Sequence, residues 1–258
     1  MNKKKIAIVL VLLFIVGAVS GYLSYGIYEE NMFKKAQHGN EWLNATVTAH
    51  TGCMDTEDNT LESIEKGAEF AEIVEFDLHF TKEGTPVLAH DEPKGDEITF
   101  SQAAKLVKTI EGLRVNVDLK SVDNLKEVVK IAKKWDILDR IFFTGVKDEF
   151  VEAVRRDAPE VSYYLNVDVK KSKNKDMDYI NSLVKKVMEA GAIGINFNYK
   201  NASAELVSTF QNYDLLVSVW TVDKKVQMYK MLSYRPDNIT TRKPDELREN
   251  INAVLYVG

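Results

Sequence analysis

Two histidines and a group of carboxylates stand at the ends of short apolar runs in the first half of the chain. The histidines are His50 and His90, and Glu75 and Asp77 fall two positions apart within the apolar run 73–80. If that run is a β-strand, both carboxylates project from one face. Two acids on one face of an apolar strand are costly unless a cation lies between them, and oxygen ligands favour Mg²⁺ or Ca²⁺ over zinc.

A second apolar run, 114–120, adds two more charged side chains. Asp118 and Lys120 fall on one face at its end. We expect Glu75, Asp77 and Asp118 to hold one divalent cation, with a buried structural ion network as the alternative. An ammonium at this place can hold a non-bridging phosphate oxygen as a point charge, which is the role we predict for Lys120.

The order of apolar runs predicts how these residues are positioned. After about residue 44, eight β-type runs alternate with helical patterns, which is typical of an α/β fold: a single (β/α)8 TIM barrel. The runs are 44–50, 73–80, 114–120, 140–144, 161–166, 192–197, 215–220 and 238–241. The segment 82–84 is too short for a crossover, so we read 78–90 as a hairpin-like excursion above the barrel mouth, returning His90 toward the acids. Active sites of such barrels lie at the C-terminal ends of the strands.

The N-terminal segment predicts a membrane anchor. Lys3, Lys4 and Lys5 precede an apolar stretch from Ile6 to Tyr28 that is long enough to cross a bilayer. We therefore expect a basic end plus transmembrane helix over 1–28, a linker over 29–43 and the barrel over 44–258. The flanking lysines predict a cytoplasmic N-terminus and an extracytoplasmic barrel at the cell membrane. A cleaved signal peptide, which would give a secreted barrel, is the rival reading.

Composition excludes several classes of function. The net charge of −5 argues against a general nucleic-acid binder, which needs a basic face. The single Cys53 excludes an intrachain disulfide framework and a cysteine-based zinc site.

A histidine with an ordinary pKa near ~6.5 exchanges protons at neutral pH, so His50 and His90 are predicted as an acid/base pair, with the two roles left unassigned.

Four separated motifs carry a family resemblance. They are His50-Thr51-Gly52, Glu57-Asp58-Asn59-Thr60, Glu75-Phe76-Asp77 and the run from Thr81 to Asp91. In order and spacing they resemble the His-Arg-Gly, Pro-Glu-Asn-Thr, Glu-x-Asp and Thr-Lys-Asp-Gly-x-Pro-Val-x-x-His-Asp motifs of the glycerophosphodiester phosphodiesterase family, one of the phospholipase-like TIM barrels. The resemblance implies that Asp58 is a further candidate metal ligand. It also implies that Trp220 forms an aromatic wall for the alcohol part of the substrate.

The chain departs from the family pattern at several positions. Thr51 stands where the family has a phosphate-binding arginine, and a threonine cannot supply a bidentate positive fork. Asp58 and Asp118 stand where the family has glutamate. Arg242 or Lys243 could partly replace the lost charge, although solvated loop residues are the simpler reading. Only 92–98 separates Asp91 from the next helical run, which predicts an open site.

The expected function is metal-dependent hydrolysis of glycerophosphodiesters or related lipid-headgroup phosphodiesters beside a membrane. Two alternatives stay open. One is a barrel that binds phosphate ligands without turnover, which the departures at Thr51 and Asp58 favour. The other is a phospholipase D-like lyase acting on phospholipids, because Asp118-Leu119-Lys120 also resembles the sphingomyelinase D-type barrels.

Overall fold

A closed barrel of parallel strands forms the body of the computed structural model, which describes residues 3–37 and 45–256. Within that part, eight parallel strands follow the order β1-β9-β8-β7-β6-β5-β4-β2, and pairing of β1 with β2 closes the ring. Their bounds are β1 (Thr46–Ala49), β2 (Ile73–Phe80), β4 (Arg114–Leu119), β5 (Ile141–Val146), β6 (Tyr163–Asn166), β7 (Gly194–Asn198), β8 (Leu216–Trp220) and β9 (Asn238–Thr241). The predicted TIM barrel is confirmed.

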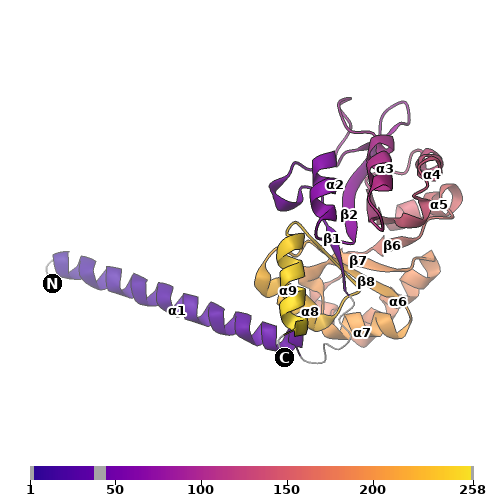
Figure 1. Cartoon of the computed structure of the whole chain (residues 1–258). Helices are drawn as coiled ribbons and strands as arrows, with labels where there is room; N and C mark the ends of the chain where they lie inside the picture. The colour runs from indigo at the N-terminus through magenta and orange to yellow at the C-terminus, as the bar shows by residue number, and fades with distance from the viewer. Residues whose placement is uncertain (1–2, 38–44, 257–258) are drawn as a thin grey trace.

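Helices cover the outside of the barrel (Figure 1). They are α2 (Leu61–Ala68), α3 (Phe100–Thr109), α4 (Leu125–Lys134), α5 (Asp148–Asp157), α6 (Met177–Ala190), α7 (Ala204–Asn212), α8 (Lys225–Tyr234) and α9 (Pro244–Tyr256). Outward side chains of the strands pack beneath them, as where Phe76 of β2 meets Phe100 of α3 with ring centroids 6.1 Å apart. Burial of these apolar side chains is the main favourable contribution to closing the barrel.

The predicted hairpin is confirmed. The short strand β3 (Pro86–Leu88) pairs antiparallel with β2, so that Leu78 lies opposite Leu88 and Phe80 opposite Pro86. The backbone N–H of Ala89 donates to the carbonyl of Asp77 at 3.2 Å, which extends the pairing to the start of His90. The chain returns in this way to the strand that carries the two acids.

Alternate side chains of each strand point into the barrel, and their chemistry changes with height. Near the bottom, Ile73, Phe142 and Tyr164 form a small apolar cluster. Two residues further along the same strands stand the polar side chains of Glu75, Thr144 and Asn166, of which the first two are buried. The Thr144 hydroxyl lies 2.8 Å from Asn116 Oδ1 of the neighbouring strand β4. The period of two therefore places an apolar floor beneath a polar mouth.

The long helix α1 (Lys3–Gln37) joins the barrel at α8 and projects away from it (Figure 1). Met32 and Ala36 are buried there, and Phe33 meets Tyr229 edge to face at 5.1 Å. The range 29–43, expected as a linker, is helical as far as Gln37, because its apolar positions three and four apart face α8. Residues 38–44 lie outside the described part.

Among the described residues, no helix is long and apolar enough to cross a membrane. The predicted span 6–28 includes many residues whose side chains lie outside the described part, so the anchor stays a prediction.

Candidate active site

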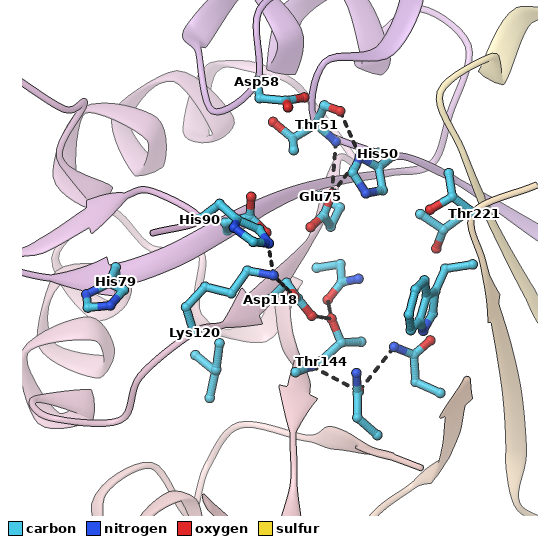
Figure 2. Close-up of a pocket in the computed structure, with 18 of the residues that line it drawn as sticks. His50, Thr51, Asp58, Glu75, His79, His90, Asp118, Lys120, Thr144 and Thr221 are labelled. Carbon is cyan, nitrogen blue, oxygen red and sulfur yellow. Dashed lines mark hydrogen bonds and ion pairs between the residues drawn. The ribbon is translucent and has the colours of Figure 1, made fainter. Parts of the chain in front are cut away.

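A cavity of about 630 Å³ opens at the C-terminal ends of the strands (Figure 2). We call it the acid-lined cavity because its floor carries three carboxylates. Glu75 and Asp77 of β2 and Asp118 of β4 offer ligand atoms that all lie within 4.8 Å of one another. The parallel pairing of β2 with β4 sets Asp77 beside Asp118, and both acids of β2 are buried. The predicted convergence of these acids is confirmed.

Lys120 reaches into this group of acids. Its Nζ lies 2.8 Å from Asp77 Oδ1 and 2.5 Å from Asp118 Oδ2. Burial opposes the charge on this ammonium, but the two aspartates outweigh burial and raise the pKa of Lys120 above its usual value. Sequence analysis assigned Lys120 to phosphate alone. The structure shows that it also neutralises two of the candidate metal ligands.

Glu75, unlike the two aspartates, does not pair with the Lys120 ammonium. Its burial, together with the nearby charges of Asp77 and Asp118, raises the pKa of Glu75 to about 7, although His50 acts in the opposite direction. The nearest oxygen of Glu75 lies 3.7 Å from His50 Nδ1. Three acids this close leave one of them poorly satisfied when no further cation is present.

The backbone at Thr51 holds His50 and Glu75 in place. The Thr51 N–H donates to Glu75 Oε2 at 2.9 Å, and the Thr51 carbonyl lies 2.7 Å from His50 Nδ1. A carbonyl only accepts hydrogen bonds, so this contact requires the proton of neutral His50 to be on Nδ1 and leaves the lone pair on Nε2. Gly52 makes the turn possible, because it has φ +70° and a Cβ there would meet the Asp58 carboxylate at 2.0 Å.

The second predicted histidine lines the cavity at its exposed rim. His90 has two thirds of its side chain exposed, and its Nδ1 lies 3.0 Å from Asp91 Oδ1. His79, on the same strand as the acids, also lines this cavity, but its ring bonds to the backbone of Phe80, and Figure 2 shows it apart from the cluster. His50, which follows β1, and His90, which the hairpin returns to the mouth, therefore line one cavity, as predicted.

Asn59 orients Asp77, a role that sequence analysis missed. Its Nδ2 donates to Asp77 Oδ2 at 2.9 Å, and its Oδ1 accepts the Asp77 N–H at 2.9 Å. Asn59 adopts a left-handed backbone with φ 61°, which asparagine tolerates better than most residues. Asn59 stands between Asp58 and Thr60 in the motif that resembles Pro-Glu-Asn-Thr, and this position was the signal that could have identified its role.

The structure does not place Asp58 among the clustered acids. The carboxylate of Asp58 is about half exposed and lies 3.3 Å from Nη2 of Arg242. The Nε of the same guanidinium donates to the Thr51 carbonyl at 3.4 Å. Asp58 lines the same cavity but stays outside the cluster of three acids and pairs with Arg242, so its role as a metal ligand stays a prediction. Arg242 stands beside Thr51, the position that lacks the family arginine, and its exposed side chain, at the bend after β9, contacts both Thr51 and Asp58.

Comparison with known proteins agrees with this arrangement. The profile of the glycerophosphoryl diester phosphodiesterase family matches residues 45–99 and 96–246. The chain belongs to this family. Members of the family are phosphoric diester hydrolases. A glycerophosphodiester phosphodiesterase from Caldanaerobacter subterraneus is 25% identical over 247 residues, covering 84% of this chain and all of the relative.

Solved structures share the fold of this family member. A putative glycerophosphoryl diester phosphodiesterase from Silicibacter pomeroyi matches with a TM-score of 0.69 and 17% identity, over 84% of this chain and 97% of that one. A phosphodiesterase from Oleispira antarctica, solved with its product sn-glycerol-3-phosphate, matches with a TM-score of 0.67 and 16% identity, over 80% and 96%.

The residues present fit the divalent metal that this phosphodiesterase fold implies. The donor set consists of carboxylate oxygens alone, which suits a hard cation such as Mg²⁺ or Ca²⁺. Three carboxylates and the ammonium of Lys120 leave two formal negative charges, which one divalent ion would balance. Burial first, and then the charges of Asp77 and Asp118, raise the pKa of Glu75, and a cation bound among these acids would oppose that rise.

Trp220 lies on the opposite side of the mouth, at the end of β8. It is 36% exposed and lines both the acid-lined cavity and a second, adjoining cavity. An exposed indole at a barrel mouth is a suitable wall for an organic group. The contact of Trp220 with the alcohol part of a substrate stays a prediction, at a position open to both cavities.

Proposed function

We propose that this family member hydrolyses glycerophosphodiesters or related lipid-headgroup phosphodiesters with the help of a divalent metal, Mg²⁺ or Ca²⁺. The observation that carries the proposal is the convergence of Glu75, Asp77 and Asp118 within one cavity that His50 and His90 also line. A phosphodiesterase of the same fold was solved with sn-glycerol-3-phosphate as its product, which supports a glycerophosphodiester substrate.

The three acids would hold the metal. When bound, the ion supplies electrostatic polarisation of a phosphoryl oxygen. Lys120 and Arg242 are cations that line the same cavity, and we assign them to the remaining non-bridging phosphate oxygens. For Lys120, this requires its ammonium to give up part of its contact with Asp77 and Asp118. For Arg242, it requires the guanidinium to turn from Asp58, a contact that is open to solvent.

His50 and His90 divide the proton transfers. His50 donates its Nδ1 proton to the Thr51 carbonyl, which directs Nε2 to accept the proton of the attacking nucleophile. His90 stands at the exposed rim, where it protonates the departing alcohol. We take water as the nucleophile, which gives the phosphomonoester in one displacement.

Phosphorus NMR tests the proposal. The full chain, purified in a mild detergent, is incubated with glycerophosphocholine and either Mg²⁺ or Ca²⁺. We expect a phosphomonoester signal, which disappears with a chelator and with Asp77→Asn. A persistent cyclic phosphate would indicate the lyase route instead. Metal and phosphate binding with no product from any diester would favour the non-catalytic alternative.

We also propose that 1–28 anchors the barrel at the cell membrane, with the barrel on the extracytoplasmic side. The support is the sequence order of three lysines followed by the apolar stretch from Ile6 to Tyr28. Membrane fractions washed with alkaline carbonate should retain the full chain and lose a variant that begins at residue 29. Release of the full chain by the wash would overturn the anchor.

A further inference from the structure

A second cavity of about 510 Å³ adjoins the acid-lined cavity at the ends of β6, β7 and β8. The two cavities share four residues at their boundary, including Asn166, Asn196 and Trp220. We call the second one the amide-lined cavity because of its asparagines. A phosphate held at the acids would therefore have one of its organic groups extending toward this cavity.

The orientation of two carboxamides is fixed by a backbone donor. The Gly145 N–H donates to Asn166 Oδ1 at 2.9 Å, so this atom must be the oxygen. Asn196 presents its Nδ2 to the same oxygen at 3.1 Å. Asn196 Oδ1 consequently faces the other way. It is a buried acceptor with no partner, in a side chain that is only 4% exposed.

An unpartnered buried acceptor costs roughly 1–3 kcal/mol, and in native proteins it calls for a ligand or a water. The buried amide of Asn238, at the start of β9, is satisfied, because its Oδ1 accepts the Thr48 hydroxyl at 2.7 Å. Asn196 differs from Asn238 in lining both cavities. A hydroxyl group is the complement that its carboxamide oxygen requires. That oxygen has almost no accessible surface in the free chain, so the hydroxyl would reach it after a small rotation of the Asn196 side chain or through one bridging water.

The charges around the amide-lined cavity select against a cationic ligand. Its lining includes two exposed lysines, Lys147 and Lys200, but one acid, Asp168. A quaternary ammonium group needs several aromatic faces or carboxylates around it. Trp220 is the single aromatic residue among the described side chains that line this cavity.

We propose that the amide-lined cavity binds the alcohol part of the phosphodiester and selects a polyhydroxy alcohol, uncharged or anionic, over a quaternary ammonium alcohol. The inference rests on the proposed function, because that function places the phosphate beside the three acids. It assigns Asn196 as a hydrogen-bond acceptor for a hydroxyl and Lys147 and Lys200 as the source of the preference against cations.

Paired substrates test this preference. Glycerophosphoinositol and glycerophosphocholine share the glycerol phosphate and differ in the alcohol. With the full chain we expect kcat/KM to be at least about 10-fold higher for the inositol diester, because a site built to hydrogen-bond hydroxyls rejects a partner that lacks them. Asn196→Leu and Lys200→Ala should each lower that ratio at least about 3-fold.

Matched controls separate selectivity from folding. Asn116→Leu removes an equally buried amide on the other side of the mouth, so it should change both substrates alike and keep the ratio. Lys94→Ala removes a lysine from a separate surface hollow and should leave both values unchanged. If thermal melting shows that Asn196→Leu is not folded, the substrate ratio of Lys200→Ala, which changes an exposed side chain, decides the inference.

The outcomes distinguish this inference from the proposed function. Hydrolysis of both diesters at equal rates, or a preference for the choline diester, overturns the inference and leaves the proposed function standing. Hydrolysis of neither diester overturns the proposed function. Calorimetry with the two intact diesters then decides the inference: tighter binding of the inositol diester that Lys200→Ala abolishes supports it, and equal or tighter binding of the choline diester overturns it.

Discussion

The two sides of the barrel mouth carry different kinds of polar side chain and are suited to binding different groups. On the side of β1, β2 and β4, three carboxylates gather around Lys120, whose ammonium pairs with Asp77 and Asp118 but not with Glu75. On the side of β6, β7 and β8, carboxamides dominate, and the unsatisfied atom is a neutral acceptor on Asn196. The acidic side is therefore suited to holding a cation that contacts a phosphate, and the amide side is suited to recognising an uncharged group beside that phosphate.

Replacing an acid should show the largest difference between the two sides. We expect Asp77→Asn to lower kcat at least about 10³-fold, which corresponds to roughly 4 kcal/mol of lost transition-state stabilisation. Asp168→Asn, the corresponding change on the amide side, should lower kcat by less than about 5-fold. Steady-state kinetics at saturating metal measures both. Similar losses in the two variants would contradict the division of the mouth.

Removing either predicted acid/base histidine comes next. His50→Ala and His90→Ala should each lower kcat about 10²- to 10³-fold, the usual contribution of a positioned proton-transfer group. His79→Ala is the matched control, because His79 lies on the acid-bearing strand but bonds to its own backbone. Near-normal turnover in both His50→Ala and His90→Ala would refute their assignment.

The crowding of acids predicts a pH dependence of stability in metal-free protein. The folded-state pKa of Glu75, about 7, lies above its ordinary value of 4.5, so the folded chain holds a proton that the unfolded chain releases. This stabilisation is fully present below the unfolded value and is lost as pH rises through 7, a difference of about 3 kcal/mol. Chemical denaturation at pH 5 and pH 8 measures it. Glu75→Gln should remove the difference, and saturating Ca²⁺ should reduce it; an unchanged slope in Glu75→Gln would contradict the assignment.

Arg242 should make a smaller contribution, mainly to binding. We expect Arg242→Gln to raise KM about 10- to 30-fold, because a bidentate guanidinium is lost from the phosphate site. Arg242→Lys should recover part of the loss. Lys243→Gln, which changes the neighbouring residue paired with Glu246, serves as the control. If Arg242→Gln and Lys243→Gln behave alike, the cation at 242 does not contact phosphate.

The smallest effect should come from the aromatic wall. Trp220→Leu keeps an apolar side chain but removes the broad indole face, so we expect KM to rise about 3- to 5-fold with kcat nearly unchanged. The same variant should affect the inositol and choline diesters alike. A larger effect on the choline diester would assign Trp220 to cation recognition and weaken the contrast between the two sides.

The barrel and its acids were predictable because their signals are local. A period of two within 73–80 places Glu75 and Asp77 on one face, and the parallel register of β2 with β4 adds Asp118. The hairpin was predictable from the shortness of 82–84. The helical start of 29–43 was not, since its polar composition hides the spacing of Met32 and Ala36 against α8.

The remaining site residues depend on contacts that no spacing encodes. Arg242 meets Asp58 across 184 positions, so only the closed ring brings them together. Asn166 and Asn196 end or interrupt apolar strands, which was a signal for inward polar positions. Which of their atoms is left without a partner depends on the backbone of Gly145, from a different strand.

A crystal structure grown with Mn²⁺ and sn-glycerol-3-phosphate tests the central claim most directly. We predict an anomalous peak bonded to Glu75, Asp77 and Asp118, with the phosphate on the ion and within reach of His50. An absence of metal at these acids, with Lys120 still bridging Asp77 and Asp118 beside the bound phosphate, would contradict it.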